Sequence, residues 1–378
     1  MYFKDIVGQA TLKGKLINNI NQGRISHAQL FVGPEGSGNL LLAMAYARYL
    51  CCNNRGDTDA CGTCSSCVKF NKLAHPDLNF FYPIPSRKQG EKTFISKDYI
   101  NDWRTFLQKS PYGSLNAWYN HLEVENKQGI INAEDCNEVI RVLGYKSWES
   151  DYKIVIIWMI ERLYHSAAPK LLKILEEPPE KTVFLIVSEN QDLILNTILS
   201  RTQLIKVPRL SDSEIEEGLI NLHGLTSDVA QHAAFLADGN FYHALTLAHN
   251  QDASESNTNL LRFWLRDCYS FKPKEIMTHV DKLAKLGREK QKNFLGFGLE
   301  IFRQCMLVNY HVGELVRAPG QASEFVDKFS SVLNPTAAMQ MTEEFNKAIY
   351  HIERNANPKI LFTDLSLIMT RIFKGTRT

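Results

Sequence analysis

Cysteines gather in one short part of the sequence, where four of the eight fall within 16 residues. Cys61, Cys64 and Cys67 follow one another with two residues between neighbours, and either Cys51 or Cys52 precedes them. Four thiolates bind Zn²⁺ tetrahedrally, and tight turns bring Cys-x2-Cys pairs to one ion. Because such a shell leaves no open position for water, the spacing predicts one structural zinc ion per chain. The alternatives are free thiols and a redox site.

A second stretch, GPEGSGNLLLA, begins at Gly33 and has the glycines of a phosphate-binding loop, G-x-x-x-x-G-K-[ST]. Gly33 and Gly38 have the required spacing, with Gly36 between them. Asn39 and Leu40 stand where the loop normally has its lysine and its hydroxyl residue. The lysine would reach the phosphates and the hydroxyl would coordinate Mg²⁺. We therefore expect no functional site for ATP and Mg²⁺, and the alternative is a glycine turn that binds nothing.

The acidic partner of such a loop is missing as well. Nucleotide-hydrolysing proteins of this kind end a second strand in acidic residues that hold the metal and polarise water. Here the run KIVIIWMIERL has Trp158 and Met159 at that position. Glu161 comes two or three residues late, and we interpret it as a solvated charge. The sequence therefore predicts that the chain does not hydrolyse ATP, although backbone N–H groups alone leave weak nucleotide binding open.

The elements that must position these residues follow from the apolar pattern. Residues 27–33 predict a buried strand before the glycines, and residues 40–50 predict a buried helix after them. Further buried strands are predicted at residues 153–160, 182–189 and 204–210, and a helix that two prolines stop is predicted at residues 166–177. Strands that alternate with helices predict an α/β fold around a parallel sheet.

The pattern becomes purely helical after residue 210. Ser211 and Glu214 form a capping box at the start of a helix. The polar stretch at residues 248–259 is typical of a linker. The predicted domains are an α/β domain at 1–210 that contains the cysteine loop at 51–67, a small helical domain at 211–250, and a helical domain at 251–378.

The bulk properties exclude few functions. The chain has 378 residues, 44% of them hydrophobic, and a net charge of +2, so overall charge points to neither nucleic acid nor membrane. No apolar run approaches the roughly 18 residues of a transmembrane helix. The first dozen residues are polar and charged, without the apolar segment of a secretory signal. We therefore expect a cytoplasmic protein without a membrane partner.

The order of these parts resembles the bacterial clamp-loader family, the AAA+ proteins of the DNA polymerase III holoenzyme. The likeness covers roughly residues 1–250, and the family's Cys-x8-Cys-x2-Cys-x2-Cys spacing selects Cys52 as the first zinc ligand. The other stretches that carry it are FKDIVGQATLKGKLINNINQGRISHAQLFVGPEGSG, HPD, LLKILEEPPEKTVFLIVSEN, ILSRTQ and ADGNFYHAL, at residues 3–38, 75–77, 171–190, 198–203 and 237–245.

The resemblance implies an α/β P-loop AAA+ domain with a parallel sheet, then a small helical lid domain and an all-α collar domain for oligomerisation. Motor subunits of the family, gamma and tau, keep a lysine, a threonine, an Asp-Glu pair and a sensor 2 arginine. The corresponding residues here are Asn39, Leu40, Trp158, Met159 and Tyr242. The segment usually written SRC keeps its arginine, Arg201, and this combination resembles the delta-prime subunits.

Arg201 is thereby implied to be an arginine finger, which stabilises transition-state charge in the ATP site of a neighbouring subunit. The implied protein is a non-hydrolysing stator of the DNA-directed DNA polymerase holoenzyme, and is not itself catalytic. Its implied partners are the gamma/tau motor subunits and the delta subunit, and it reaches the sliding clamp and primer-template DNA through the assembly.

Two other functions stay open from the sequence. One is an ATP-hydrolysing gamma/tau-like subunit whose unusual site uses Glu161 and the bare glycine loop. The other is a zinc-dependent nucleic-acid-binding module, although only Lys69 and Lys72 lie just behind the cysteine loop.

One region, at about residues 79–127, exceeds what the family usually has between the zinc loop and the second strand. It contains the loop-like stretch YPIPSRKQGEK, Trp103, Trp118 and several tyrosines. We interpret it as an insertion that packs on the surface or on a neighbouring molecule.

Overall fold

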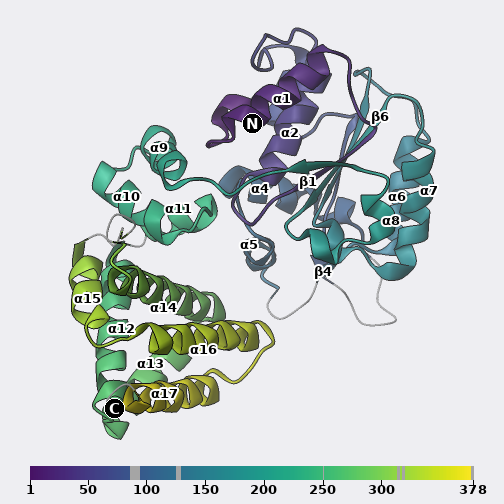
Figure 1. Cartoon of the computed structure of the whole chain (residues 1–378). Coiled ribbons are helices and arrows are strands. Elements are labelled where there is room, and N and C mark those ends of the chain that lie inside the picture. The colour runs from purple at the N-terminus through teal and green to yellow at the C-terminus, as the bar shows by residue number, and fades with distance from the viewer. Residues whose placement is uncertain (86–93, 125–128, 250, 313–315, 317–319, 376–378) are drawn as a thin grey trace. The chain divides into compact units, whose positions relative to one another are not determined.

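The computed structural model describes residues 1–85, 94–124, 129–249, 251–312, 316 and 320–375 (Figure 1). The chain divides into two compact units. Unit 1 comprises Met1–Leu225 and Ala237–Leu245, and unit 2 comprises Thr226–Leu236 and Thr246–Thr378. The division into three domains, with boundaries near residues 210 and 250, stays a prediction.

Unit 1 is built on a five-stranded sheet with the strand order β2-β5-β6-β1-β7, in which every neighbouring pair is parallel. The strands are β1 (Ala28–Val32), β2 (Leu78–Phe81), β5 (Lys153–Trp158), β6 (Thr182–Ser188) and β7 (Gln203–Lys206). A second, antiparallel pair consists of β3 (Ile84–Pro85) and β4 (Gly129–Ile130). The α/β class that the sequence predicted is confirmed.

Helices cover both faces of the sheet (Figure 1). Helix α2 packs on one face, where the Phe31 ring lies 6.4 Å from that of Tyr46. Helices α6, α7 and α8 bury their apolar residues with Leu30 and Ile186 on the other face. The helices of this part of the chain are α1 (Ala10–Asn21), α2 (Asn39–Cys51), α3 (Ser65–Asn71), α4 (Ile100–Lys109), α5 (Leu115–His121), α6 (Ala133–Leu143), α7 (Ala168–Glu176), α8 (Asn196–Leu199), α9 (Asp212–His223) and α11 (Phe241–His249).

Local sequence explains where these elements begin and end. Strand β5 is a β-branched run whose residues are all buried, as an inner strand covered on both faces requires. Helix α2 starts directly after Gly38, whose φ of 87° lies in the left-handed region that glycine adopts without strain. Helix α9 begins at the predicted capping box, in which the Ser211 side chain accepts from the Glu214 backbone N–H.

Two expectations about secondary structure are wrong. The predicted buried strand at 204–210 is instead β7, an edge strand with Leu204 exposed, because only β1 pairs with it in the sheet. The predicted linker at 248–259 is helical from residue 251, where α12 (Gln251–Tyr269) begins. Polar residues such as Gln and Glu are good helix formers, so a polar stretch alone does not mark a linker.

The region at 79–127 does not only pack on the surface, because part of it belongs to the core of unit 1. Trp103 of α4 and Trp118 of α5 are fully buried. The ring of Tyr82 stacks on Trp103 at 4.1 Å, and the ring of Trp158 on strand β5 lies 5.1 Å from Trp103. The region therefore adds an aromatic cluster to the end of β5. Its residues 86–93 and 125–127 lie outside the described residues.

Unit 2 is helical in its described part. Its helices are α10 (Ser227–Leu236), α12, α13 (Pro273–Ala284), α14 (Arg288–Asn309), α15 (Gly320–Ser330), α16 (Pro335–Glu353) and α17 (Pro358–Gly375), with the end of α11. Trp264 lies fully buried among Phe294, Phe345 and Phe362, and its indole N–H donates to Ser366 Oγ at 2.9 Å. Among the described residues, no helix combines the length and the hydropathy that crossing a bilayer requires.

Candidate functional site

The glycine loop, residues 33–38, lies between strand β1 and helix α2, as the sequence predicted. The Gly33 N–H donates to Ser188 O at the end of β6, which ties the loop to the neighbouring strand. Gly36 and Gly38 have φ angles of 74° and 87°, a conformation that other residues adopt only with strain. The segment is therefore a tight glycine turn between β1 and α2.

The residue at the lysine position is turned onto this loop. Asn39 is buried, and its Nδ2 donates to Gly33 O at 3.0 Å and to Ser188 O at 3.2 Å. Its Oδ1 accepts from the Leu40 N–H at 2.8 Å. A lysine would extend away from the backbone toward phosphates, whereas this amide bridges the two ends of the loop. Leu40, at the hydroxyl position, is buried as well.

Side chains from two other segments pack against the loop. A Cβ added to Gly36 would lie 2.0 Å from Asn240 Oδ1, and one added to Gly38 would lie 3.2 Å from the Tyr112 ring. Asn240 Nδ2 donates to Glu35 Oε1 at 3.1 Å, and the Phe241 N–H donates to Gly36 O at 3.2 Å. The start of α11 is thereby fastened to the glycine loop, with Tyr242 in its first turn.

Tyr112 comes from the region at 79–127, and sequence reasoning did not single it out. Its hydroxyl accepts from the Val7 N–H at 2.8 Å, and its ring lies 4.7 Å from that of Phe241. Burial raises the pKa of this phenol well above its usual value, which keeps the hydroxyl neutral. The region thus reaches the glycine loop, and its aromatic ring occupies space beside Gly38.

The two positions where nucleotide-hydrolysing proteins of this kind have acidic residues hold apolar side chains here. Trp158 and Met159 are buried, and Trp158 belongs to the aromatic cluster with Trp103 and Phe106. Metal ligands for Mg²⁺ must be oxygen atoms, which neither side chain has.

Glu161 is not a solvated charge, contrary to expectation. It lies in a short 3-10 turn (Ile160–Arg162) after β5, where its Oε1 accepts from the Glu189 N–H at 3.0 Å and its Oε2 is buried. Burial raises the pKa of Glu189 to about 8, and the charges of Glu35 and Glu161 add to this rise. Three carboxyl groups therefore lie close to the loop that would have to bind a polyanion.

The four sulfur atoms of Cys52, Cys61, Cys64 and Cys67 lie within 4.8 Å of one another. Four of the distances between pairs of these sulfur atoms are 3.5–4.0 Å. Four thiolates about 2.3 Å from one tetrahedral ion would be about 3.8 Å apart. The donor set and the spacing therefore fit zinc.

Backbone N–H groups support the sulfurs in a repeating pattern. The N–H of Cys61 donates to Cys52 Sγ, that of Cys64 to Cys61 Sγ, and that of Cys67 to Cys64 Sγ, at 3.3–3.4 Å. The N–H groups of Cys64 and Thr63 lower the pKa of Cys61 to about 6, which favours a thiolate at neutral pH.

Cys51 lies outside this group. It is buried, and burial raises the pKa of its thiol to about 12, so it stays protonated. The geometry therefore favours Cys52 as the first ligand, in agreement with the spacing of the family.

Arg48 is a supporting residue that the sequence did not reveal, because it lies in a helix that is otherwise apolar. Its guanidinium is fully buried and lies 3.6 Å from the centre of the Tyr2 ring. It donates to Cys67 O at 3.1 Å and to Asn71 Oδ1 at 2.8 Å. Arg48 thus ties the end of the cysteine loop to helix α2.

The aspartate of the HPD stretch, Asp77, has a structural role. The Asp77 carboxylate accepts from the N–H groups of Trp148, Glu149 and Ser150 at 2.6–2.9 Å. It therefore holds the segment that leads into β5.

Arg201 lies in the turn between α8 and the edge strand β7. Its Nε donates to Glu176 Oε1 at 2.7 Å, and its Nη1 donates to Thr197 O at 2.8 Å. The side chain is 32% exposed and that of Glu176 48%. The guanidinium is therefore held in place yet remains accessible at the edge of the sheet.

Arg201 and the glycine loop lie at opposite ends of the same strand pair. Strand β7 runs parallel to β1, with Gln29 opposite Gln203 and Val32 opposite Lys206. The loop follows β1, whereas Arg201 precedes β7. At about 3.3 Å per residue the two are separated by roughly 13 Å of strand, so Arg201 lies far from this chain's own loop.

A family model described as "DNA polymerase III, delta subunit" matches residues 8–119 and 116–211. The DNA polymerase III subunit delta' of Bacillus subtilis (strain 168) is 27% identical over 252 residues, which are 66% of this chain and 62% of that protein. The DNA polymerase III subunit gamma of Buchnera aphidicola subsp. Acyrthosiphon pisum (strain APS) is 25% identical over 214 residues, 57% of this chain and 47% of that protein. The chain thus matches less than two thirds of the length of either relative.

A solved structure, that of a gamma subunit-related protein of DNA polymerase III from Thermotoga maritima, is similar with a TM-score of 0.45. It is 14% identical, and the match covers 96% of this chain and 99% of that one. The family model, by contrast, spans more than half of this sequence. This chain therefore belongs to the family of DNA polymerase III delta subunits.

Proposed function

We propose that this chain is a non-hydrolysing, delta-prime-like subunit of a DNA polymerase III clamp loader. It acts as a stator that supplies Arg201 to the ATP site of a neighbouring gamma/tau motor subunit. The delta subunit is its other partner, and it reaches the sliding clamp and primer-template DNA through the assembly. Family membership and the delta' and gamma relatives support the place in the loader.

The observation that carries the non-hydrolysing part is the placement of Asn39. Its amide is satisfied by Gly33 O, Ser188 O and the Leu40 N–H, so the lysine position is used to close the loop. Catalysis of phosphoryl transfer is almost entirely positioning and charge neutralisation. This chain supplies no cation at that position, and the negative charges of Glu35 and Glu161 oppose a triphosphate.

The finger role is supported by the position and the chemistry of Arg201. Its distance from this chain's own loop means that any phosphate it serves belongs to another chain. In the isolated chain it pairs with Glu176, and exposed ion pairs contribute only about 0–1 kcal/mol. A phosphoryl group, which accepts the guanidinium fork in a bidentate manner, therefore competes well with this carboxylate.

The experiment is reconstitution of the loader from motor subunits, the delta subunit and this chain, followed by its DNA-stimulated ATPase. Arginine fingers contribute about 10³–10⁵ in rate, so Arg201→Ala is expected to reduce turnover at the adjoining site about a thousandfold or more. Arg209→Ala is the matched control, because Arg209 is an exposed, ion-paired arginine of the same unit. Unchanged turnover in a complex that still assembles with Arg201→Ala would remove the finger role.

We also propose that the cysteine loop binds one structural zinc ion. Metal analysis of the purified chain is expected to give one zinc per chain, and Cys64→Ser is expected to lose it and to lower the midpoint of thermal unfolding. Cys51→Ala is the control that keeps the zinc. A metal-free chain of unaltered stability would contradict this proposal.

A further inference from the structure

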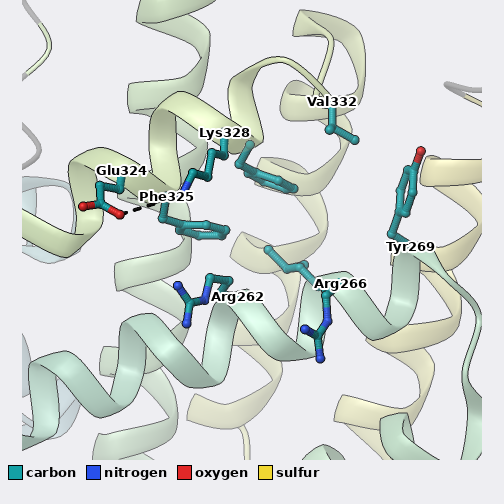
Figure 2. Close-up of a pocket in the computed structure, with 9 residues that line it drawn as sticks. Arg262, Arg266, Tyr269, Glu324, Phe325, Lys328 and Val332 are labelled. Atoms are coloured by element: carbon teal, nitrogen blue, oxygen red, sulfur yellow. Dashed lines mark ion pairs between the residues drawn. The ribbon is translucent and has the colours of Figure 1, made fainter.

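A pocket in unit 2, far along the sequence from the residues discussed above, has no part in the proposed function. It is a hollow of about 210 Å³ between helices α12 and α15. Figure 2 shows the lining residues Arg262, Arg266 and Tyr269 of α12 and Phe325 and Lys328 of α15, with the Arg266 guanidinium pointing away from Phe325 in this view. We call it the α12–α15 pocket.

The inner wall of the pocket is apolar. The rings of Phe325 and Phe329 stack at 5.2 Å with an interplanar angle of 16°. Leu265 also lines the pocket and is fully buried, and Val332 is 41% exposed. A cavity of about 150 Å³ with such a lining accepts a benzene ring. The pocket therefore has room for one aromatic or large aliphatic side chain.

The rim of the pocket is positive. Arg262, Arg266 and Lys328 line the hollow together with one carboxylate, Glu324, whose Oε2 lies 3.8 Å from Lys328 Nζ (Figure 2). Outside the lining, Asp267 Oδ1 lies 3.7 Å from Arg266 Nε. Arg262 donates to the neutral Asn259 Oδ1 at 2.9 Å. Its guanidinium and that of Arg266 each lie 4.9 Å from the centre of the Phe263 ring, a residue of α12 outside the pocket lining.

This combination selects one class of partner. An apolar side chain fits the hollow, and carboxylates beside it match the three cations of the rim. A nucleic acid fits less well, because the two phenylalanine rings stack on each other rather than on a base, and the Glu324 carboxylate would repel phosphates.

We propose that the α12–α15 pocket binds an acidic peptide segment of a partner protein. One phenylalanine or large aliphatic side chain enters the hollow, and carboxylates on its two sides pair with Arg262, Arg266 and Lys328. This is helix-surface recognition of a short acidic motif, with the apolar anchor giving affinity and the charges giving specificity.

The test is fluorescence anisotropy of the full-length chain with the labelled peptide Asp-Asp-Phe-Asp-Asp. Saturable binding in the micromolar range is expected. Replacing the aspartates by asparagines, or the phenylalanine by serine, is expected to weaken it at least tenfold. Equal binding of all three peptides, or no binding of any, would overturn the proposal.

Variants of the chain locate the site. The double variant Arg262→Glu, Arg266→Glu is expected to abolish binding, and Val332→Asp to weaken it at least tenfold. Arg303→Glu is the matched control, because Arg303 is equally exposed on α14. Binding that both rim and control variants leave unchanged would place the peptide elsewhere. Two other outcomes would overturn the proposal. If the chain binds an oligothymidylate more tightly than the peptide and the rim variants abolish that binding, the pocket binds a nucleic acid. If the chain self-associates and the rim variants abolish the association, the pocket binds a second copy of the chain.

Discussion

The glycine loop and the Arg201 turn flank the same pair of parallel strands, and their polar groups are used in opposite ways. At the loop, the Asn39 amide is buried and bonded to the backbone on both sides. At the turn, the Arg201 guanidinium is partly exposed and bonded to an exposed carboxylate. Buried and satisfied polar groups stabilise a fold, whereas an accessible charge in a weak ion pair is available to a partner.

Under the proposed function, the comparison explains how a chain could lose the nucleotide site of its own loop and still supply an arginine finger. A P-loop side chain acts on the nucleotide bound by its own chain, and a finger acts on the nucleotide of the neighbour. The two are separated by the length of the strands. Substitutions at one end therefore leave the other end intact.

The largest expected effect is on stability, when the loop is given back its missing residues. Asn39→Lys with Leu40→Thr removes the bonds to Gly33 O and Ser188 O and places a charge and a hydroxyl in buried positions. The expected cost is about 2–5 kcal/mol of unfolding free energy, measured by urea denaturation. We expect no ATPase, because Trp158 and Met159 remain. Asn18→Lys, on the exposed side of α1, is the control.

A stable double variant that hydrolyses ATP would break the comparison. It would mean that these two substitutions are enough to give the loop a catalytic function, and that its structural role does not prevent this.

The next largest expected effect is a dependence of folding stability on pH, which arises from Glu189 beside the loop. Glu189 has its pKa raised to about 8, so the folded chain holds a proton there that the unfolded chain releases near pH 4.5. Stability is therefore expected to fall as the pH rises from about 4.5 to about 8. Glu189→Gln is expected to remove this slope and to raise stability by at least about 1 kcal/mol at pH 8, measured by thermal unfolding.

Glu180→Gln, an exposed substitution in the same unit, controls for the loss of one negative charge. If it flattens the pH profile as much as Glu189→Gln does, the slope reflects overall charge and not the carboxyl groups beside the loop.

The smallest effect concerns the partner of Arg201. Glu176→Gln removes an exposed ion pair, so stability is expected to change by less than about 1 kcal/mol and loader turnover by less than about threefold. Glu177→Gln is the adjacent control. A loss of turnover as large as that of Arg201→Ala would show that Glu176 positions the finger and that the turn is not freely available.

Much of the fold was predictable because its signals are local. The strands around residues 27–33 and 182–189 are apolar runs bounded by turns, and the capping box at Ser211 marks its helix directly. The cysteine cluster was predictable for the same reason, since its ligands are close in sequence and their spacing fixes the turns.

Features that depend on contacts between distant segments were not predictable. The burial of Trp103 depends on Trp158, and the placement of Tyr112 depends on Val7 and Gly38. The supporting role of Arg48 could not be predicted from its place in an apolar helix, because it depends on a hydrogen bond to Cys67 in the cysteine loop. The exposure of β7 follows from its place at the sheet edge, which local pattern does not reveal.

The most direct test of the central claim is a titration of the purified chain with Mg-ATP, followed by heat of binding and by phosphate release. A loop closed by Asn39 and flanked by carboxyl groups predicts no saturable binding below about 1 mM, which corresponds to about −4 kcal/mol, and no turnover. Micromolar affinity with release of phosphate by this chain alone would contradict it.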